Sequence, residues 1–237
     1  MKLLRTILGE EETCVYLPDR RAQSEYKIVS ELSAAEYEGL MERGWRKFGM
    51  ALHRPVCAGC RECRSLRVET EKFMPSRSQR RTLQKNADLT VAFTPPYLDD
   101  ERLALYHRYH AAQEALKGWP GVSKTPQDYF YSFVHNPVPA IEIAVRDETG
   151  TLRAVVLTDM TENIVSGVYH YHDPDWRERA VGVFAMLQTI ELARRQGRKW
   201  VYFGYWVSGC PSLSYKASFR PHEVLGSDGV WRPQGPV

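Results

Sequence analysis

The order of strand-like and helix-like segments in the second half of the chain constrains its fold most strongly. Three strand-like runs come first, over residues 140–146, 153–160 and 164–171, with turn residues between them. Short turns between consecutive strands predict a meander of hairpins. A segment with apolar residues at helical spacing follows over 181–195, and a buried-looking strand over 199–207 comes next. We therefore predict an α+β layer of helices on a mostly antiparallel sheet, whose last strand can enter parallel after the helical crossover.

That order is the one found in the acyl-CoA N-acyltransferase core, called GNAT-like below. Such enzymes carry a pyrophosphate-binding loop between a strand and the main helix. Arg179-Ala180-Val181-Gly182 occupies the corresponding place here, although Phe184 stands where a small residue is expected. Backbone N–H groups at the N-terminus of that helix can still hold an anion. A coenzyme A-dependent N-acetyltransferase is therefore one alternative function for this chain.

The part of the chain before about residue 95 is predicted to be an irregular, basic, cysteine-containing region. Thr94-Pro95-Pro96 breaks the pattern and marks a boundary. We therefore expect two units, 1–95 and 96–237, of which the second is the GNAT-like core.

Start and stop signals predict the helices outside the C-terminal core. They are expected over 34–43, 79–86 and 99–117, and from Thr125-Pro126 onwards. Ser33 can cap the first, with Glu36 as the return half of a capping box. Thr is a good N-cap and Pro suits the first helical position, so Thr125-Pro126 is a helix start.

Positive charge concentrates in one window of the sequence. Residues 43–85 contain 12 lysines and arginines against 3 glutamates, a local charge of +9 in a chain whose net charge is +3. Such a concentrated field suggests that a polyanion, and in particular a nucleic acid, is bound here.

The same window holds three of the five cysteines, Cys57, Cys60 and Cys63. Their spacing lets thiolates converge on one ion, with Cys14 as the natural fourth donor. Zinc and an iron–sulfur cluster are both compatible with four thiolates. Three reduced cysteines in a tight loop are the alternative. A zinc-dependent RNA-binding module without catalysis is thus a second alternative function.

The apolar segments are too short for membrane insertion or export. No apolar run approaches the roughly 20 residues that cross a bilayer. The short apolar start is ended by Glu10, Glu11 and Glu12, and no small-residue cleavage site follows. We expect a cytoplasmic protein without a membrane partner.

Short motifs along nearly the whole chain resemble one known family. They include Cys14-Val15-Tyr16-Leu17-Pro18, Gly44-Trp45-Arg46-Lys47-Phe48-Gly49, Ser78-Gln79-Arg80-Arg81, Asp173-Pro174-Asp175, Gly204-Tyr205-Trp206 and Tyr215-Lys216. The ordered set resembles the bacterial aspartate/glutamate leucyltransferases of the aminoacyl-tRNA–protein transferase family. Their longer eukaryotic relatives are the arginyl-tRNA–protein transferases.

The resemblance implies an activity, a fold and two partners. It implies a GNAT-like enzyme that transfers leucine from leucyl-tRNA to the N-terminal α-amine of a protein beginning with Asp or Glu. The product then enters the N-degron route to proteolysis. The chemistry requires no cofactor. The length of 237 residues favours leucine, and transfer of arginine to the same acceptors is the alternative.

The candidate binding residues are basic or aromatic. They are Arg77, Gln79, Arg80, Arg81, Arg179, Tyr205 and Trp206. The arginines can pair with tRNA phosphates or with an acceptor carboxylate. The aromatic residues can form the pocket for a leucyl side chain or stack the terminal adenosine of tRNA. A solvated basic face and ordinary core packing are the alternatives.

The candidate catalytic residues are Tyr215, Lys216, His170 and Asp173. Tyr169 and Tyr171 alternate with His170 and His172 on one strand, so one face should carry the tyrosines and the other the histidines. His170, Asp173 or Tyr215 can relay a proton.

Lys216 is also a candidate for recognising the acceptor. A lysine among aromatic residues beside a Gly/Ser/Pro-rich loop is a poor core residue. Relatives commonly carry lysine and methionine where Ser212-Leu213 stands here, so the role of that lysine falls on Lys216 or on an arginine. Arg80 and Arg81 are the competing candidates for binding the acidic side chain.

Overall fold

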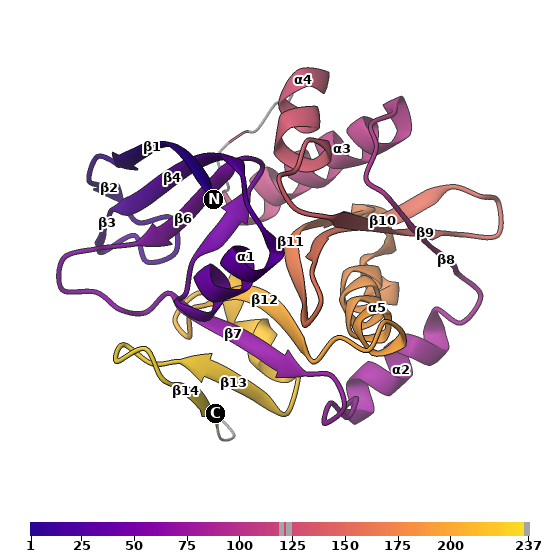
Figure 1. Cartoon of the computed structure of the whole chain (residues 1–237). Helices are drawn as coiled ribbons and strands as arrows, with labels where there is room; N and C mark the ends of the chain where they lie inside the picture. The colour runs from indigo at the N-terminus through magenta and orange to yellow at the C-terminus, as the bar shows by residue number, and fades with distance from the viewer. Residues whose placement is uncertain (119–120, 122–124, 235–237) are drawn as a thin grey trace.

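An eight-stranded mixed sheet forms the centre of the protein (Figure 1). This computed structural model describes residues 1–118, 121 and 125–234. The strand order is β14-β13-β7-β12-β11-β10-β9-β8. Their bounds are β7 Arg64–Glu69, β8 Thr90–Thr94, β9 Ala140–Arg146, β10 Leu152–Met160, β11 Ile164–His172, β12 Trp200–Trp206, β13 His222–Leu225 and β14 Trp231–Pro233. The predicted meander β9-β10-β11 is confirmed, and all pairs are antiparallel except β11 with β12.

The helices surround this sheet. They are α1 Ala34–Glu42, α2 Arg77–Lys85, α3 Asp100–Lys117, α4 Pro126–Tyr129, α5 Val181–Arg195 and α6 Pro211–Ser214, with short turns η1 Phe130–Val134, η2 Pro174–Arg179 and η3 Tyr215–Ser218. Neither α3 nor any other helix of the described residues combines the length and apolar character that a membrane span requires.

Helices α3 and α5 cover opposite faces of the central strands. Ala154 and Val156 of β10 belong to a core cluster with α5 residues. Val155 and Leu157, which point to the other face, belong to a cluster with α3 residues. The predicted α+β architecture with a crossover helix is confirmed.

The parallel pair β11 and β12 separates after three residues. Only Ile164–Ser166 pairs with Trp200–Tyr202. At that level the register shifts in β11 against β10 and in β12 against β7, which marks a bulge in each strand. Gly204 of β12 has φ +84°, a left-handed conformation that favours glycine. We call the opening between residues 167–172 of β11 and 203–206 of β12 the splay.

The N-terminal region contains a second sheet, so the prediction that it is irregular was wrong. Its order is β1-β4-β6-β5, with β1 Lys2–Leu8, β4 Ser24–Glu31, β6 Ala51–Pro55 and β5 Arg46–Phe48, and β2 Glu12–Thr13 pairs separately with β3 Arg21–Ala22. These strands are short and carry many charged residues, which hides their two-residue period. Strands β7 and β8 also precede residue 95 but belong to the central sheet, so both regions share that sheet.

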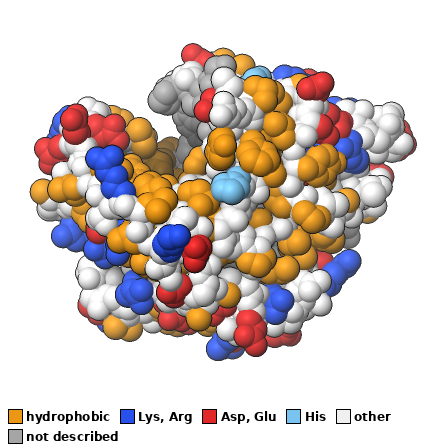
Figure 2. Space-filling view, turned by 45° about the horizontal axis from the view of Figure 1, so that its top comes forward, with side chains coloured by type: hydrophobic (Ala, Val, Ile, Leu, Met, Phe, Trp, Pro, Cys, Tyr) orange, Lys and Arg blue, Asp and Glu red, His pale blue; other side chains and the backbone are white. Residues whose placement is uncertain are grey.

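The two sheets leave a hollow on one face. Figure 2 shows this hollow between the lobe of the N-terminal sheet and the side of the molecule that carries α4, with apolar side chains along the visible floor. The face therefore offers a recessed, largely apolar surface between the two regions.

The predicted helix caps agree with the structure except at α2. Ser33 and Thr125 each form a capping box, and Gly118 ends α3 in a left-handed conformation. Helix α2 begins at Arg77, two residues before the predicted start, because Ser76 and Gln79 form its capping box. The Gln79 side chain therefore accepts from the backbone of Ser76 and caps the start of α2.

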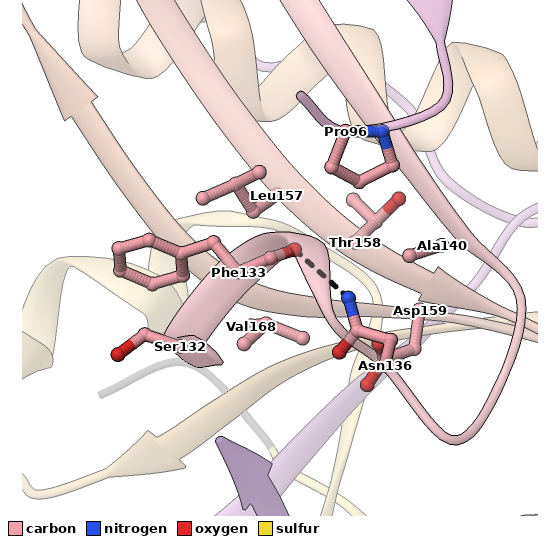
Figure 3. Close-up of a pocket in the computed structure, with 9 residues that line it drawn as sticks. All are labelled: Pro96, Ser132, Phe133, Asn136, Ala140, Leu157, Thr158, Asp159 and Val168. Carbon is pink, nitrogen blue, oxygen red and sulfur yellow. Dashed lines mark hydrogen bonds between the residues drawn. The ribbon is translucent and has the colours of Figure 1, made fainter. Parts of the chain in front are cut away.

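Strand β5 is held to the central sheet by a buried ion pair. Lys47 Nζ lies 3.1 Å from Asp159 Oδ1 of β10 and donates to Asn136 Oδ1 at 2.7 Å. Tyr37 Oη donates to the other Asp159 oxygen at 2.7 Å. Figure 3 shows Asn136 and Asp159 beside a cavity of about 10 Å³. This pair fixes the strand that carries Arg46.

Candidate active site

Arg46 lies at the point where β11 leaves β12. Its Nη2 donates to Gly167 O of β11 at 2.8 Å. The residue is 6% exposed, and its buried Nη1 has no hydrogen-bond partner among the described residues. Arg46 was not selected from the sequence, although it lies within the motif 44–49. A buried arginine inside a short strand leaves no local pattern in the sequence, so nothing there marked Arg46 as a site residue.

Lys216 reaches the splay from the other end of the chain. It lies in η3, and its Nζ donates to Tyr205 O of β12 at 2.9 Å. Burial, with a smaller contribution from Arg46, lowers the pKa of Lys216 to about 7.

Gly204 separates the two cations. A Cβ placed on it would lie 3.5 Å from Lys216 Nζ and 3.6 Å from Arg46 Nη2. The missing side chain therefore leaves a small space that both cations border.

His170 and His172 share one face of β11, and the tyrosines share the other, as predicted. The two imidazole rings stack with centroids 6.3 Å apart. On the opposite face, Tyr169 Oη bonds His110 Nε2 at 2.7 Å and Tyr171 Oη bonds the hydroxyl of Tyr129 at 2.6 Å.

Both histidines are neutral at pH 7. Burial, followed by His172, Lys216 and Lys117, lowers the pKa of His170 to about 3. Burial, followed by Lys117, lowers the pKa of His172 to about 4. A neutral imidazole near the splay can accept a proton released during a reaction.

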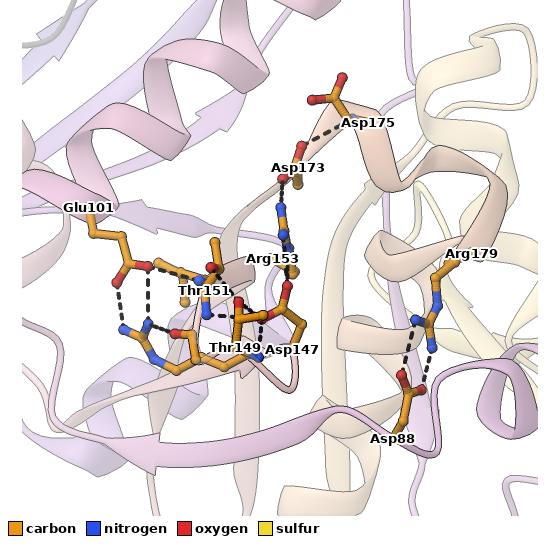
Figure 4. A network of polar contacts seen from close by, with 12 residues as sticks. Asp88, Glu101, Asp147, Thr149, Thr151, Arg153, Asp173, Asp175 and Arg179 are labelled. Carbon is orange, nitrogen blue, oxygen red and sulfur yellow. Dashed lines mark hydrogen bonds and ion pairs between the residues drawn. The ribbon is translucent and has the colours of Figure 1, made fainter.

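Asp173 is committed to ion pairs. Its carboxylate lies 2.6 Å from Arg108 Nη2 and 2.6 Å from Arg153 Nη1, and its side chain is fully buried. It also caps η2 by accepting from Asp175 N. Figure 4 shows Asp173 between Arg153 and Asp175. Since both oxygens are engaged, we assign Asp173 a structural role and do not retain it as a proton relay.

Arg179 is engaged as well. It forms an ion pair with Asp88 and donates to Lys85 O, which joins the start of α5 to the end of α2 (Figure 4). These contacts leave the guanidinium oriented toward protein groups. The structure thus gives Arg179 a bridging position between two helices.

The basic residues of α2 fall into two groups. Arg77 and Arg81 are exposed and have no hydrogen bond or ion pair with the described residues. Arg80 is exposed but donates to Pro75 O at 2.6 Å. Gln79 is buried, and its amide donates to Ser218 O at 3.3 Å, so its side chain connects α2 to η3 instead of facing solvent.

The aromatic candidates are packed into the protein. Trp206 is 3% exposed in the central core, with Arg64 over its ring at 4.6 Å. Tyr205 Oη donates to Gly44 O at 2.9 Å, and Tyr215 Oη donates to Met186 Sδ at 3.2 Å. These contacts describe core packing around the splay, and the predicted stacking of adenosine stays a prediction.

The other four cysteines lie close enough to Cys63 to act on its thiol. Burial, with added effects of Cys14, Cys57, Cys60 and Cys210, raises the pKa of the Cys63 thiol to about 12. Cys210 is buried, as predicted. Cys60 accepts from Arg20 Nη1 at 3.3 Å. Among the residues that the structure describes, no three His, Cys, Asp or Glu side chains are placed to hold one metal ion. A zinc ion or an iron–sulfur cluster at these cysteines stays a prediction, and no chemistry is derived from either.

A mixed sheet whose parallel strands open beside a crossover helix defines the GNAT-like acyltransferase class. Two models of one family match the chain, "Arginine-tRNA-protein transferase, N terminus" over residues 12–81 and "Arginine-tRNA-protein transferase, C terminus" over residues 101–226. This chain belongs to that family.

Curated relatives carry a more specific name. An aspartate/glutamate leucyltransferase of Campylobacter jejuni is 37% identical over 216 residues, which cover 91% of this chain and 90% of the relative. One from Halorhodospira halophila is 35% identical over 233 residues, which cover 98% and 97%. Among solved structures, FemX matches 86% of this chain and 79% of its own at a TM-score of 0.48 and 10% identity, a likeness too weak to carry an argument.

Proposed function

We propose that this protein transfers leucine from leucyl-tRNA to the N-terminal α-amine of proteins beginning with Asp or Glu. The names of its relatives support the donor and the acceptors. The observation that carries the proposal is the splay beside a parallel strand pair: Arg46 and Lys216 border it, and His170 lies on its β11 strand, near enough for Lys216 to act on its pKa. The product would carry a destabilising N-terminus and enter proteolysis through the N-degron route.

The nucleophile in this reaction is supplied by the acceptor. An N-terminal amine has a pKa of about 8, so freeing its lone pair at pH 7 costs only about 1 kcal/mol. Attack on the ester carbonyl forms the C–N bond, and collapse of the tetrahedral intermediate breaks the ester C–O bond and releases the terminal hydroxyl group of the tRNA. The nitrogen loses one proton and the leaving oxygen gains one, and the neutral imidazole of His170 passes that proton from one to the other. Most of the rate enhancement comes from holding amine and ester in contact within the splay.

We place the tRNA backbone along α2. Arg77 and Arg81 project into solvent from the first two turns of this helix, and they lie in the most basic window of the sequence. An unpaired arginine presents its donor fork to a phosphate without first breaking an ion pair. Arg80 gives additional positive charge at the same surface.

Arginine is the second candidate for the transferred residue, because both matching family models are described by arginine-tRNA. A transfer assay separates the two. Leucyl-tRNA and arginyl-tRNA are supplied separately with peptides beginning with Asp, Glu, Lys or Ala. Leucine on the Asp and Glu peptides alone supports the proposal, and arginine on the same peptides moves the donor assignment. Transfer from neither donor refutes the proposed activity.

The role of His170 is tested in the same assay. His170→Gln should lower kcat by about 100-fold, the usual scale for losing a general base. Tyr169→Phe is the matched control, since Tyr169 lies on the same strand but faces α3, where its hydroxyl bonds His110 and Tyr106. An unchanged kcat in His170→Gln would show that solvent accepts the proton.

A further inference from the structure

Arg46 and Lys216 form a pair of cations without a carboxylate partner. Neither makes an ion pair with any residue that the structure describes. Burial, Arg46 and Cys210 act on the pKa of Lys216, and no carboxylate is among them. Removing charge from water without a partner is costly, so proteins normally pair or neutralise such groups.

The other buried cations of this chain follow that rule. Lys47 and Arg102 are the other lysine and arginine residues that are buried like Arg46 in the described part of the chain, whereas Lys216 is half-buried. Lys47 faces Asp159 at 3.1 Å, and Arg102 Nε donates to Glu142 Oε1 at 2.9 Å. Arg46 is therefore the exception among these buried cations, which indicates that its counter-charge arrives with a ligand.

The donors of this pair are available to that ligand. The buried Nη1 of Arg46 has no partner within the described structure. Lys216 uses one of its three N–H donors on Tyr205 O. Gly204 leaves open the point that lies 3.5 Å from one cation and 3.6 Å from the other. Since Gly204 has no side chain there, an anion that packs against its Cα could accept from both side chains.

The burial of Arg46 favours a carboxylate on a short stem as the ligand. Arg46 is 6% exposed, so a bound group must enter the splay to reach it. In the proposed reaction the acceptor's α-amine attacks in the splay, and its own side-chain carboxylate is only one or two methylene groups from the same Cα. The nearest tRNA phosphate is separated from the ester by a whole ribose and carries a second nucleotide.

We propose that Arg46 and Lys216 bind the side-chain carboxylate of the acceptor's N-terminal Asp or Glu and thereby select acidic acceptors. This inference rests on the proposed function, and it adds Arg46 to Lys216, which the sequence already made a candidate for recognising the acceptor. Arg46 then supplies the fixed positive charge, and Lys216 supplies further N–H donors to the carboxylate. Arg80 and Arg81 on α2 are then left to the tRNA.

The test measures discrimination between an acid and its amide. Transfer from saturating leucyl-tRNA is followed with peptides that begin with Glu or Gln, and with Asp or Asn. Arg46→Gln keeps a donor for Gly167 O but removes the charge. It should lower kcat/KM for the Glu peptide by about 100-fold, mainly through KM, and change the Gln peptide by less than about threefold. Lys216→Gln should reduce the Glu-to-Gln ratio in the same direction.

The matched control is Arg81→Gln, an arginine on the exposed face of α2. It should leave the Glu-to-Gln ratio unchanged. Thermal unfolding of each variant shows whether it folds, and Lys216→Gln keeps the test decisive if Arg46→Gln does not. A ratio unchanged in both splay variants overturns the proposal. A raised KM for leucyl-tRNA with an unchanged Glu-to-Gln ratio also overturns the proposal. That result assigns Arg46 and Lys216 to binding a tRNA phosphate.

Direct binding separates this inference from the proposed function. The Glu and Gln peptides are titrated into wild-type protein and Arg46→Gln without tRNA. If the wild type binds the Glu peptide more tightly than the Gln peptide and the variant does not, Arg46 and Lys216 recognise the carboxylate. This conclusion holds even if no transfer from either tRNA is seen. In the opposite outcome, wild type and variant both transfer leucine to acidic peptides, with equal binding and equal discrimination. That result refutes the role of Arg46 and Lys216 in acceptor recognition and leaves the proposed function unchanged.

Discussion

Replacing Lys47 with Met should destabilise the protein strongly. The side chains of Lys47 and Asp159 are 0% and 1% exposed, and their charged atoms lie 3.1 Å apart. Removing one partner of such a pair leaves an uncompensated buried charge, which typically costs about 3–5 kcal/mol. Tyr37 Oη and Asn136 would still lie near the carboxylate, but neither carries a positive charge. We expect the free energy of unfolding at pH 7 to fall by about 3–5 kcal/mol.

The pH dependence identifies the cause of this loss. Burial already raises the pKa of Asp159, and the neighbouring Lys47 opposes that shift. Without Lys47 the pKa rises further, so the folded state holds a proton that the unfolded chain releases above its ordinary pKa of about 3.9. The protonated carboxyl of Asp159 therefore stabilises the folded variant at low pH. This contribution is lost as the pH rises through the raised pKa of Asp159 in the folded state. The effect of Lys47→Met should be smaller at pH 5 than at pH 8.

Urea unfolding followed by circular dichroism measures both values. Lys72→Met is the matched control, because Lys72 pairs with Glu69 while its side chain is 67% exposed. It should change the free energy of unfolding by less than about 1 kcal/mol at either pH. The double variant Lys47→Met with Asp159→Asn should recover part of the loss. Equal, small effects of Lys47→Met and Lys72→Met would refute the reasoning.

Three further predictions concern the splay and α2. Gly204→Ala should cost about 1–2 kcal/mol of stability, because φ is +84°. Its methyl group would also occupy the space between the two cations, so KM should rise for a Glu peptide but not for leucyl-tRNA. In NMR titrations the imidazoles of His170 and His172 should stay neutral at pH 5, since burial lowers their pKa values to about 3 and about 4; an ordinary value near 6.5 would contradict the burial argument. Each of Arg77→Gln and Arg81→Gln should reduce the salt dependence of tRNA binding by about 0.7 to 0.9 in the log–log slope, and unchanged slopes would move the tRNA surface elsewhere.

Local patterns in the sequence determined much of the central fold. The apolar spacing of α5 and the turn residues between β9, β10 and β11 predicted the crossover helix and the hairpins. Ser33 and Thr125 predicted helix starts, because a capping box is closed by residues three positions apart. The alternation of histidine and tyrosine on β11 followed from the two-residue period of a strand.

The tertiary structure decided what those patterns leave open. Strand β7 enters the central sheet between β13 and β12, and the first sheet forms from short charged strands. Such pairings depend on contacts between distant segments, which no local period encodes. Arg46 and Lys216 come from opposite ends of the chain and meet only because both bulged strands open at one level. The sequence made Asp173 a catalytic candidate and Gln79 a binding candidate, but both side chains are buried and bonded to protein groups.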